Sequence, residues 1–538
     1  TFFLNVAQSL TSTEYLLAII PLNCNEGSEG VKMTEDRELL SLCCECRRQV
    51  AGEAGAASVK DALLPFHCAL CFGILDPLFI QQVSEAAEAQ FSASQYDSSS
   101  FILALNLPFS QMLRETLIRK RFPHFNGILS DTPFKLRNIN AYIRRLQEAS
   151  GLRPTLNSDL QMTVSFENDE FTDCDRKFLT DQFPHEFCHS KKRRRYENGN
   201  GTEEIELTKV KLANVVGRLS EQHAINFPLH QSPTRPCTFS FAFERDPIYI
   251  AGRYCKYSRS LPQSPWTAEE EEPKKEGHSV SEKVSAPVEK LLGAESVRFI
   301  ASGREDMDVR MLGTGRPFVL QLINCRYAKR LHGFARFKSL LSPPSLLSLS
   351  LLFSLSSDFS PHCLFLFLCF SELGTTSLSS LRSLINTNID VTVSDLVVVS
   401  RSVGEQLSIG QEDKIKHYSA FCYSTLPVDR DRLLSLSSRC PFEISQQTPV
   451  RVMKRRALLS RPRTIHSLQA LPLDPHHFLI KLSTQAGTYV KEFVHGDFGR
   501  TRPSLADLLC CERGEVDIVE LDVEGVELEW PPADSVAK

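Results

Sequence analysis

The chain has 538 residues, of which 42% are hydrophobic and 23% are charged, and its formal net charge is -4. This length exceeds what one hydrophobic core supports, so we expect two or three domains of ordinary globular composition. The net charge excludes a uniformly basic protein, but residues 446–510 hold ten Lys and Arg against four Asp and Glu. This local excess of positive charge favours a partner that carries phosphates.

The chain contains 17 cysteines and no recognisable secretory signal, which predicts a reducing compartment with free or metal-bound thiols. It begins at Thr1 rather than Met, as a fragment does, so the sequence leaves open whether a targeting segment lies upstream. Cys43-x-x-Cys46 and Cys68-x-x-Cys71 have the spacing with which paired thiolates grip one zinc ion. The alternative is that Cys43 and Cys44 are chance members of a Cys-rich stretch.

Strand-like runs that alternate with helical stretches begin after the cysteines. FILALNL at residues 101–107 and MTVSFEN at 162–168 are typical of strands in a small α/β domain. A second α/β region begins near residue 238, where Phe239, Phe241 and Phe243 alternate with polar residues. We therefore predict a Cys-rich region over 1–95, an accessory domain over 96–235 and a larger domain over 236–538.

Two segments combine features that suit nucleic acid. KKRRR at 191–195 reads as a nuclear-import or RNA-contacting patch, or as a merely solvated loop. Residues 252–266 interleave Arg and Lys with aromatic residues, as a loop does when bases stack on its rings and cations hold phosphates. The alternative for this second segment is that its aromatic residues pack on a neighbouring helix.

An atypical insert covers about residues 331–371. Most of it consists of Ser, Leu, Phe, Pro and Cys, and its prolines, serines and Asp358 argue against a membrane span. Ser, Leu, Phe and Pro all have codons made only of pyrimidines, so we hypothesise that the insert is retained-intron material that forms no structure in the core. Finding it in most mature transcripts would contradict this hypothesis.

The stretch ASGREDMDVRMLGTGRPF at residues 301–318 has the character of a site. Its acids and arginines lie beside flexible glycines, and on strand spacing Asp306, Asp308 and Arg310 share one face. A carboxylate flanked by arginines is held ionised, the form that a nucleophile or general base needs. The alternative is a salt-bridged turn at the end of a strand.

Further chemistry follows the insert. Residues 390–399 and 417–424 are strand-like, and the second run contains Tyr418. In TQAGTYVKEFVHGDFG at 484–499 we expect a helix to begin at Val490, with Tyr489 and Lys491 directed back towards the strand edge.

GRED at 303–306, the Tyr418 strand and AGTYVKEFVHGDFGRTRP at 486–503 together resemble the tRNA pseudouridine synthases of the archaeal and eukaryotic Pus-ten family. The likeness extends from AGRYCKYSR near Gly252 to DVEGVELEWPPA near the C-terminus, and more loosely upstream into a THUMP-type RNA-binding region. It implies a multidomain α+β protein: a mixed antiparallel sheet with flanking helices over 236–538, and a THUMP-like, zinc-knuckle accessory part before it.

The resemblance implies isomerisation of uridine to pseudouridine in the T arm of tRNA, at the family's target positions 54 and 55, without a cofactor. It makes Asp306 the nucleophile, with Asp308 as the second candidate for that role or, in preference, a structural partner of Arg310. The resemblance also implies that Tyr418 contacts the flipped uracil and that Tyr489 makes a second contact with the substrate. It implies that Lys491 places a cation against the catalytic carboxylate, and that Arg304 supports the flipped nucleotide.

The remaining expectations concern metal, partners and location. The family's first cysteine pair has no counterpart at its usual distance from Cys68 and Cys71, so Cys43 and Cys46 are the substitute ligands for a structural zinc. We expect tRNA as partner, with other structured RNAs open, no membrane, and a nuclear and cytoplasmic location; the sequence does not predict an oligomeric state. The competing interpretations are a non-catalytic RNA-binding or RNA-processing factor with the same basic surface and a zinc-dependent nucleic-acid module.

Overall fold

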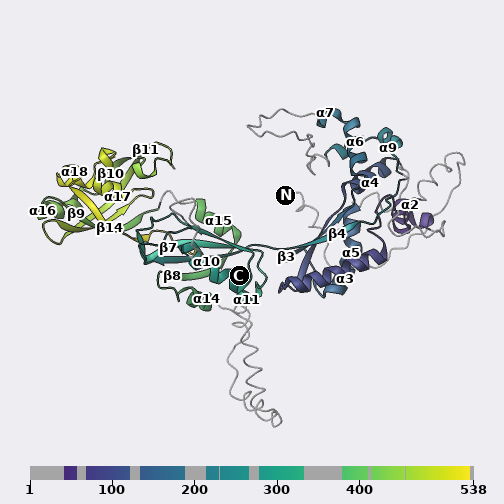
Figure 1. Cartoon of the computed structure of the whole chain (residues 1–538), viewed down its shortest axis with the longest axis horizontal. Helices are drawn as coiled ribbons and strands as arrows, with labels where there is room; N and C mark the ends of the chain where they lie inside the picture. The colour runs from purple at the N-terminus through teal and green to yellow at the C-terminus, as the bar shows by residue number, and fades with distance from the viewer. Residues whose placement is uncertain are drawn as a thin grey trace, which may run out of the picture. The chain divides into compact units, whose positions relative to one another are not determined.

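The structure is a computed structural model that describes residues 41–56, 68–121, 134–187, 214–229, 231–265, 278–332, 378–409, 414–454 and 456–532. The basic run at 191–195 and nearly all of the insert at 331–371 lie outside these ranges. The chain forms two compact units, which are described separately: Thr1–Ile80, Leu107–Asn138 and Phe166–Thr238 make the first, and Gln81–Asn106, Ile139–Ser165 and Phe239–Lys538 make the second. Figure 1 shows the course of the chain.

The first unit is mainly helical. A buried guanidinium, that of Arg114, organises it: its central carbon lies 4.3 Å from the ring centre of Phe171 and 5.4 Å from that of Phe227. Arg114 also donates a hydrogen bond of 2.9 Å to the carbonyl of Gln231 and lies 4.0 Å from the carboxylate of Asp175, which offsets part of the cost of burying its charge. Its helices are α2 (Cys44–Ala56), α4 (Phe109–Arg121), α6 (Thr172–Gln182), α7 (Pro184–Phe187) and α9 (Glu221–Asn226).

A four-stranded sheet has the order β2-β1-β3-β4, and β1 pairs in parallel with both β2 and β3. The strands predicted at 101–107, 162–168 and from 238 onwards are confirmed, because alternate residues such as Phe101, Leu103 and Leu105 are buried. The bounds are β1 (Ser100–Asn106), β2 (Arg153–Pro154), β3 (Leu160–Glu167) and β4 (Thr238–Arg245), with helices α3 (Pro77–Ser94) and α5 (Phe134–Ser150).

A ten-stranded sheet dominates the second unit, with the order β13-β10-β11-β12-β9-β14-β7-β5-β8 and β6 paired to β7. The β14–β7 pair is parallel and the other pairs are antiparallel, which confirms the predicted mixed antiparallel sheet. Its strands are β5 (Ile248–Lys256), β6 (Ser296–Ala301), β7 (Arg310–Ile323), β8 (Val391–Val399), β9 (Lys416–Ser424), β10 (Phe442–Gln447), β11 (Ser460–Pro472), β12 (His477–Thr484), β13 (Thr501–Arg502) and β14 (Val516–Val526).

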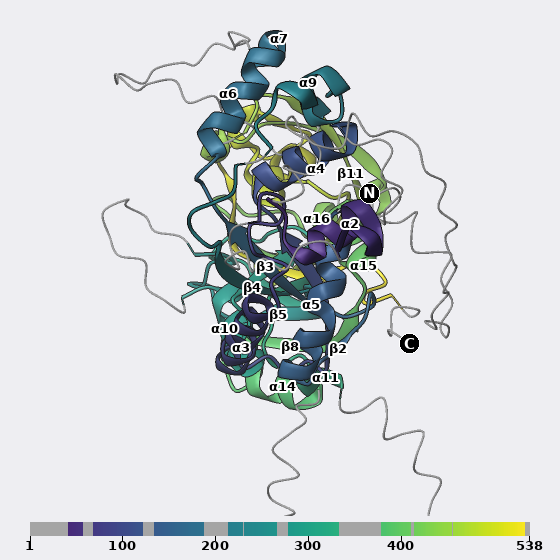
Figure 2. The same ribbon diagram turned by 90° about the vertical axis from the view of Figure 1, so that its right-hand side faces the viewer.

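Helices cover both faces of this sheet. Neighbouring residues of a strand point to opposite faces, so one strand contributes side chains to the cores on both sides. Ile250 joins the core beneath α10, whereas Tyr249 joins a separate cluster with Leu407 of α15. Figure 2 shows α10 and α14 beside β8. The bounds are α10 (Val280–Leu292), α11 (Lys329–His332), α14 (Leu378–Ile385), α15 (Arg401–Ile409), α16 (Arg430–Ser435), α17 (Val490–His495) and α18 (Leu505–Leu509), with 3-10 turns at Leu436–Arg439, Val450–Val452 and Asp497–Gly499.

In the part of the chain that the structure describes, none of the helices is both long and apolar enough to cross a lipid bilayer.

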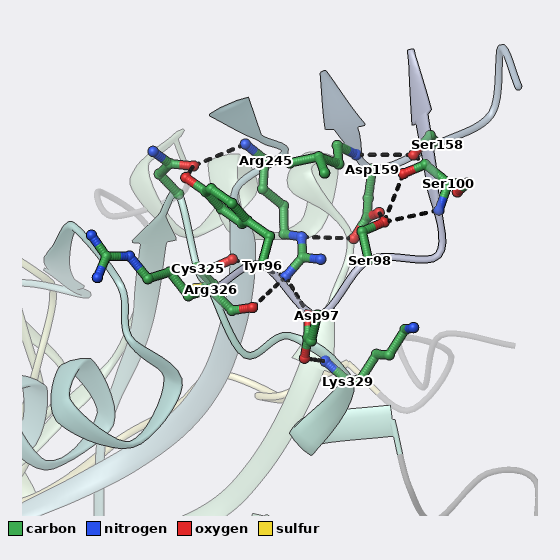
Figure 3. Close-up of polar contacts among 12 residues, drawn as sticks. Tyr96, Asp97, Ser98, Ser100, Ser158, Asp159, Arg245, Cys325, Arg326 and Lys329 are labelled. Carbon is green, nitrogen blue, oxygen red and sulfur yellow. Dashed lines mark hydrogen bonds and ion pairs between the residues drawn. The ribbon is translucent and has the colours of Figure 1, made fainter. Parts of the chain in front are cut away.

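A polar network around Arg245 joins the end of β4 to the segment after β7 (Figure 3). The Arg245 side chain is 1% exposed and forms ion pairs of 2.7 Å with Asp97 and 3.0 Å with Asp159. It also donates hydrogen bonds to the carbonyls of Cys325 and Arg326. Because a buried guanidinium needs these acceptors, the network fixes one end of the four-stranded sheet against the ten-stranded sheet.

We expect Asp97→Ala to lower the free energy of unfolding by about 3 kcal/mol, because it leaves the Arg245 charge buried and only partly compensated. The matched control is Glu405→Ala, which breaks the pair with the 75% exposed Arg401 and should cost less than about 1 kcal/mol. Urea unfolding of the two variants measures the difference. Equal shifts for both would show that the network contributes no more than a surface pair.

Candidate functional site

One cavity of about 560 Å³ in the second unit collects the residues that the sequence singles out. Arg304, Asp306, Tyr418, Tyr489 and Lys491 all line it, although they come from three separate parts of the chain. The loop between β6 and β7 supplies the first two, β9 supplies Tyr418, and the start of α17 supplies the last two.

Asp306 lies in a turn rather than on a strand. The chain leaves β6 through Gly303, whose φ is +88°, and the amide of Val309 donates a hydrogen bond to the carbonyl of Asp306. β7 begins only at Arg310, so the prediction that Asp306, Asp308 and Arg310 share a strand face is wrong. The physical reason is the left-handed glycine, which turns the chain before strand geometry can resume.

A buried ion pair holds this turn. Glu305 and Arg316 have side chains that are 0% and 2% exposed, and Nε of Arg316 donates to the carboxylate over 2.8 Å. The hydroxyl of Tyr254 donates to the same carboxylate over 2.9 Å, and it keeps its proton because burial and the charge of Glu305 raise the pKa of Tyr254. Glu305 is buried at the wall of the cavity, and the residues on either side of it, Arg304 and Asp306, line the cavity as well.

Lys256 of β5 fixes the backbone of this turn through hydrogen bonds. Its buried ammonium donates to the carbonyls of Asp306, Met307 and Leu261 over 2.9 to 3.0 Å. Burial lowers the pKa of Lys256 to about 8, although the charge of Glu305 opposes this effect. Three carbonyl contacts leave the ammonium no donor for a ligand, so Lys256 is a positioning residue.

The prediction of a nucleotide-contacting loop at residues 252–266 is therefore wrong for its first part, up to Lys256. Tyr254 and Lys256 belong to β5 and are buried. The ring of Tyr254 packs against those of Phe299 and Phe318, with ring centres 5.6 and 6.1 Å apart. Tyr254 therefore belongs to the core, close to the alternative interpretation, but it packs on strands rather than on a helix, whereas Tyr257 is 45% exposed.

The nearest cation to the Asp306 carboxylate is Arg451, which the sequence analysis did not assign to the site. Its Nη1 lies 2.9 Å from Oδ2 of Asp306, and its Nε lies 2.6 Å from the buried carboxylate of Glu492. Arg451 lies on a short turn at Val450–Val452, within the basic run TPVRVMKRR. The basic run indicates that this segment carries positive charge to a site, but nothing in it distinguishes Arg451 from its basic neighbours.

Lys491 lies between two acids. Its ammonium is 2.5 Å from the carboxylate of Asp308 and 3.8 Å from that of Asp306. Burial raises the pKa of Asp308, but the hydrogen bond and charge of Lys491 outweigh this and lower it. Arg310 pairs instead with Asp522 over 2.6 Å, so the predicted pairing of Asp308 with Arg310 is wrong.

The two tyrosines are held differently. Tyr418 is partly buried on β9, and burial raises its pKa while the charge of Arg316 opposes this, so the phenol stays neutral. Tyr489 immediately precedes α17, the helix that the sequence predicts at Val490. The buried amide of Gln446 accepts from the backbone N–H of Tyr489 and donates to its carbonyl, each over 2.9 Å, which fixes where that helix begins.

A second cluster lies in the first unit. The sulfurs of Cys43, Cys46, Cys68 and Cys71 all lie within 4.8 Å of one another, and those of Cys43 and Cys71 are 3.7 Å apart. The amides of Cys46 and Cys71 donate to the sulfurs of Cys43 and Cys68, which closes both knuckles. Four thiolates in tetrahedral contact with zinc lie roughly 3.8 Å apart, so this donor set fits the metal.

Known proteins resemble the chain over most of its length. A tRNA pseudouridine synthase Pus10 from Xenopus laevis is 30% identical over 476 residues, covering 87% of this chain and 81% of that protein. The Mus musculus protein of the same name is 30% identical over 524 residues, covering 94% and 84%. The Thermofilum pendens protein is 33% identical over 284 residues, covering 52% and 53%.

Among solved structures, a Cbf5-Nop10-Gar1 complex matches 51% of this chain and 48% of that chain at 14% identity, with a TM-score of 0.24. The family described as "Pus10, C-terminal" matches residues 249–339 and 368–527, which hold every predicted substrate-site residue. The extent and identity of these matches show the family: the chain belongs to the Pus10 family of tRNA pseudouridine synthases, which are isomerases.

Proposed function

We propose that the chain converts uridine to pseudouridine in the T arm of tRNA, with the Asp306 carboxylate as nucleophile. The observation that carries this proposal is the position of Asp306 at the wall of a 560 Å³ cavity, between Arg451 and Lys491. A cavity of this size suits one nucleotide flipped out of an RNA stack.

In the proposed reaction, the carboxylate of Asp306 attacks C1′ of the flipped nucleotide and the C1′–N1 bond breaks. The uracil then rotates and rejoins through C5, and the ester to Asp306 is released. Tyr418 packs against the uracil and Tyr489 forms a second contact. Arg451 and Lys491 hold the carboxylate in place by their charges.

The charge around the cavity supports an RNA substrate. Among the described residues, six cations line it against two acids, and an excess of this kind attracts a phosphate backbone. The cations are Arg304, Arg316, Lys416, Arg451, Arg456 and Lys491, and the acids are Glu305 and Asp306. Arg304 is exposed and lies in the turn between β6 and β7, and it supports the flipped nucleotide or its phosphate.

We expect Asp306→Asn to reduce pseudouridine formation at least about 10⁴-fold, because the amide cannot act as nucleophile. Its affinity for tRNA should stay within about threefold of the parent, because the cavity keeps its shape. The matched control is Asp308→Asn, which changes a carboxylate two residues away and should cost less than about tenfold. Mass mapping of labelled pseudouridine in T-arm RNA measures both. Full activity of Asp306→Asn would overturn the assignment, and product only outside the T arm would overturn the target.

We also propose that the four cysteines hold a structural zinc. The metal would fix the turn at Cys68–Cys71 against the start of α2 and take no part in the chemistry. We expect about one zinc per chain by elemental analysis, and less than about a tenth of that in Cys68→Ser. Exposed Cys174→Ser is the control. Equal zinc in both variants would contradict the site, and loss of isomerisation in a zinc-free chain that stays folded would contradict a purely structural role.

The location remains a proposal, because the basic run at 191–195 lies outside the described residues. A reducing compartment and a tRNA substrate support nucleus and cytoplasm. Fluorescence microscopy of the chain with and without residues 191–195 tests the nuclear part, which should be lost with the run.

A further inference from the structure

One cation in the cavity has no assigned role. Lys416 is the first residue of β9 and precedes Tyr418 by two positions, so both side chains lie on the same face of the strand. Both line the cavity. β9 is held on both sides, because Lys416 pairs in register with Thr484 of β12 and with Val526 of β14. The backbone that carries the ammonium is therefore rigid.

The other partly or fully buried cations of the cavity are already engaged. Arg316 is paired with Glu305, and Lys491 is paired with Asp308. Among the described residues, the ammonium of Lys416 makes neither a hydrogen bond nor an ion pair. A partly buried ammonium gives up part of its hydration, and with no protein acceptor among these residues it is free to donate to a ligand of this cavity.

Gly303 provides the space for this ammonium. A Cβ atom at Gly303 would lie 3.1 Å from Nζ of Lys416 and 3.0 Å from Nη1 of Arg316. The missing side chain lets both cations approach the base of the turn, three residues before Asp306. Lys416 thus lies between the tyrosine expected to contact the uracil and the turn that carries the nucleophile.

We propose that Lys416 is a further catalytic residue, whose ammonium donates a hydrogen bond to a carbonyl oxygen of the flipped uracil and stabilises the departing base. The inference rests on the proposed function. When the carboxylate of Asp306 bonds to C1′, the electron pair of the C1′–N1 bond stays on the uracil, and its negative charge spreads over N1, O2 and O4. A fixed cation beside one of these oxygens favours that state over the ground state.

The later steps need nothing further from Lys416. The C5–C1′ bond forms as the ester bond to Asp306 breaks, C5 loses its hydrogen as a proton to solvent, and N1 takes up a proton. No oxidant or reductant enters, and Lys416 keeps its three protons throughout. Lys416 therefore acts through charge, not through proton transfer.

The surroundings of Lys416 make this charge sensitive to pH. Burial and the positive charge of Arg316 lower the pKa of Lys416 to about 8, Lys414 adds to this effect and Glu305 opposes it. Asp306 and neutral Tyr418 line the same cavity. Lys416 is mostly charged at neutral pH and loses its charge as the pH rises through its pKa.

The test measures single-turnover pseudouridine formation in saturating T-arm RNA from about pH 6 to about pH 9 for the full chain, K416R and K416M. We expect the parent rate to fall above about pH 8. K416R should keep a high rate at pH 9, because arginine stays charged. K416M should lose about 100-fold in rate at pH 7, while its tRNA affinity changes less than about fivefold.

Three results would overturn the role of Lys416. An unchanged rate in K416M would remove it from the chemistry. A parent rate that rises through pH 8, with K416R inactive, would make Lys416 a general base instead. A fall above pH 8 that persists in K416R would assign the titration to Lys256, whose pKa is also about 8. Failure of the proposed function differs from all three, because the parent chain itself would then form no pseudouridine.

Discussion

The buried pair between Glu305 and Arg316 is the constraint on which the rest of the site depends. A carboxylate and a guanidinium this deeply buried are tolerated only because each satisfies the other, and the hydroxyl of Tyr254 adds a further donor. The pair fixes the direction of a short turn whose inward residue is Glu305. Asp306, the next residue, consequently faces the cavity, and the ammonium of Lys256 donates a hydrogen bond to its carbonyl.

The same constraint explains why the cavity is rich in positive charge. Arg316 is neutralised inside the core, but Arg451 of the turn at Val450–Val452 and Lys491 of α17 reach the carboxylates. Among the described residues, Lys416 pairs with none of the acids. A cavity lined by more cations than acids is suited to an anionic ligand. The four-cysteine cluster and the Arg245 network contribute differently, because they lie in parts of the chain outside this cavity.

The sequence predicts the elements well where periodicity is strong, as at β9 and at the start of α17, and the family motifs place Asp306 beside Tyr418 despite the intervening insert. It misses Arg451 and Lys256, because an ion pair or a buried lysine depends on tertiary neighbours that no local pattern specifies. The predicted Asp308–Arg310 pairing fails for a related reason: the turn at Gly303 ends strand geometry locally, and Asp522 lies in β14, far away in the sequence.

The most direct test of the role of this ion pair is the single-turnover isomerisation rate of the Glu305→Gln variant on T-arm RNA. The control is Glu443→Gln, which alters an exposed glutamate on β10. The amide leaves Arg316 buried without a charge partner, so the turn should lose its fixed direction. We expect a rate at least about 100-fold lower for a Glu305→Gln chain that is folded and still binds tRNA, and no change for Glu443→Gln. A folded Glu305→Gln chain with the parent rate would contradict this role.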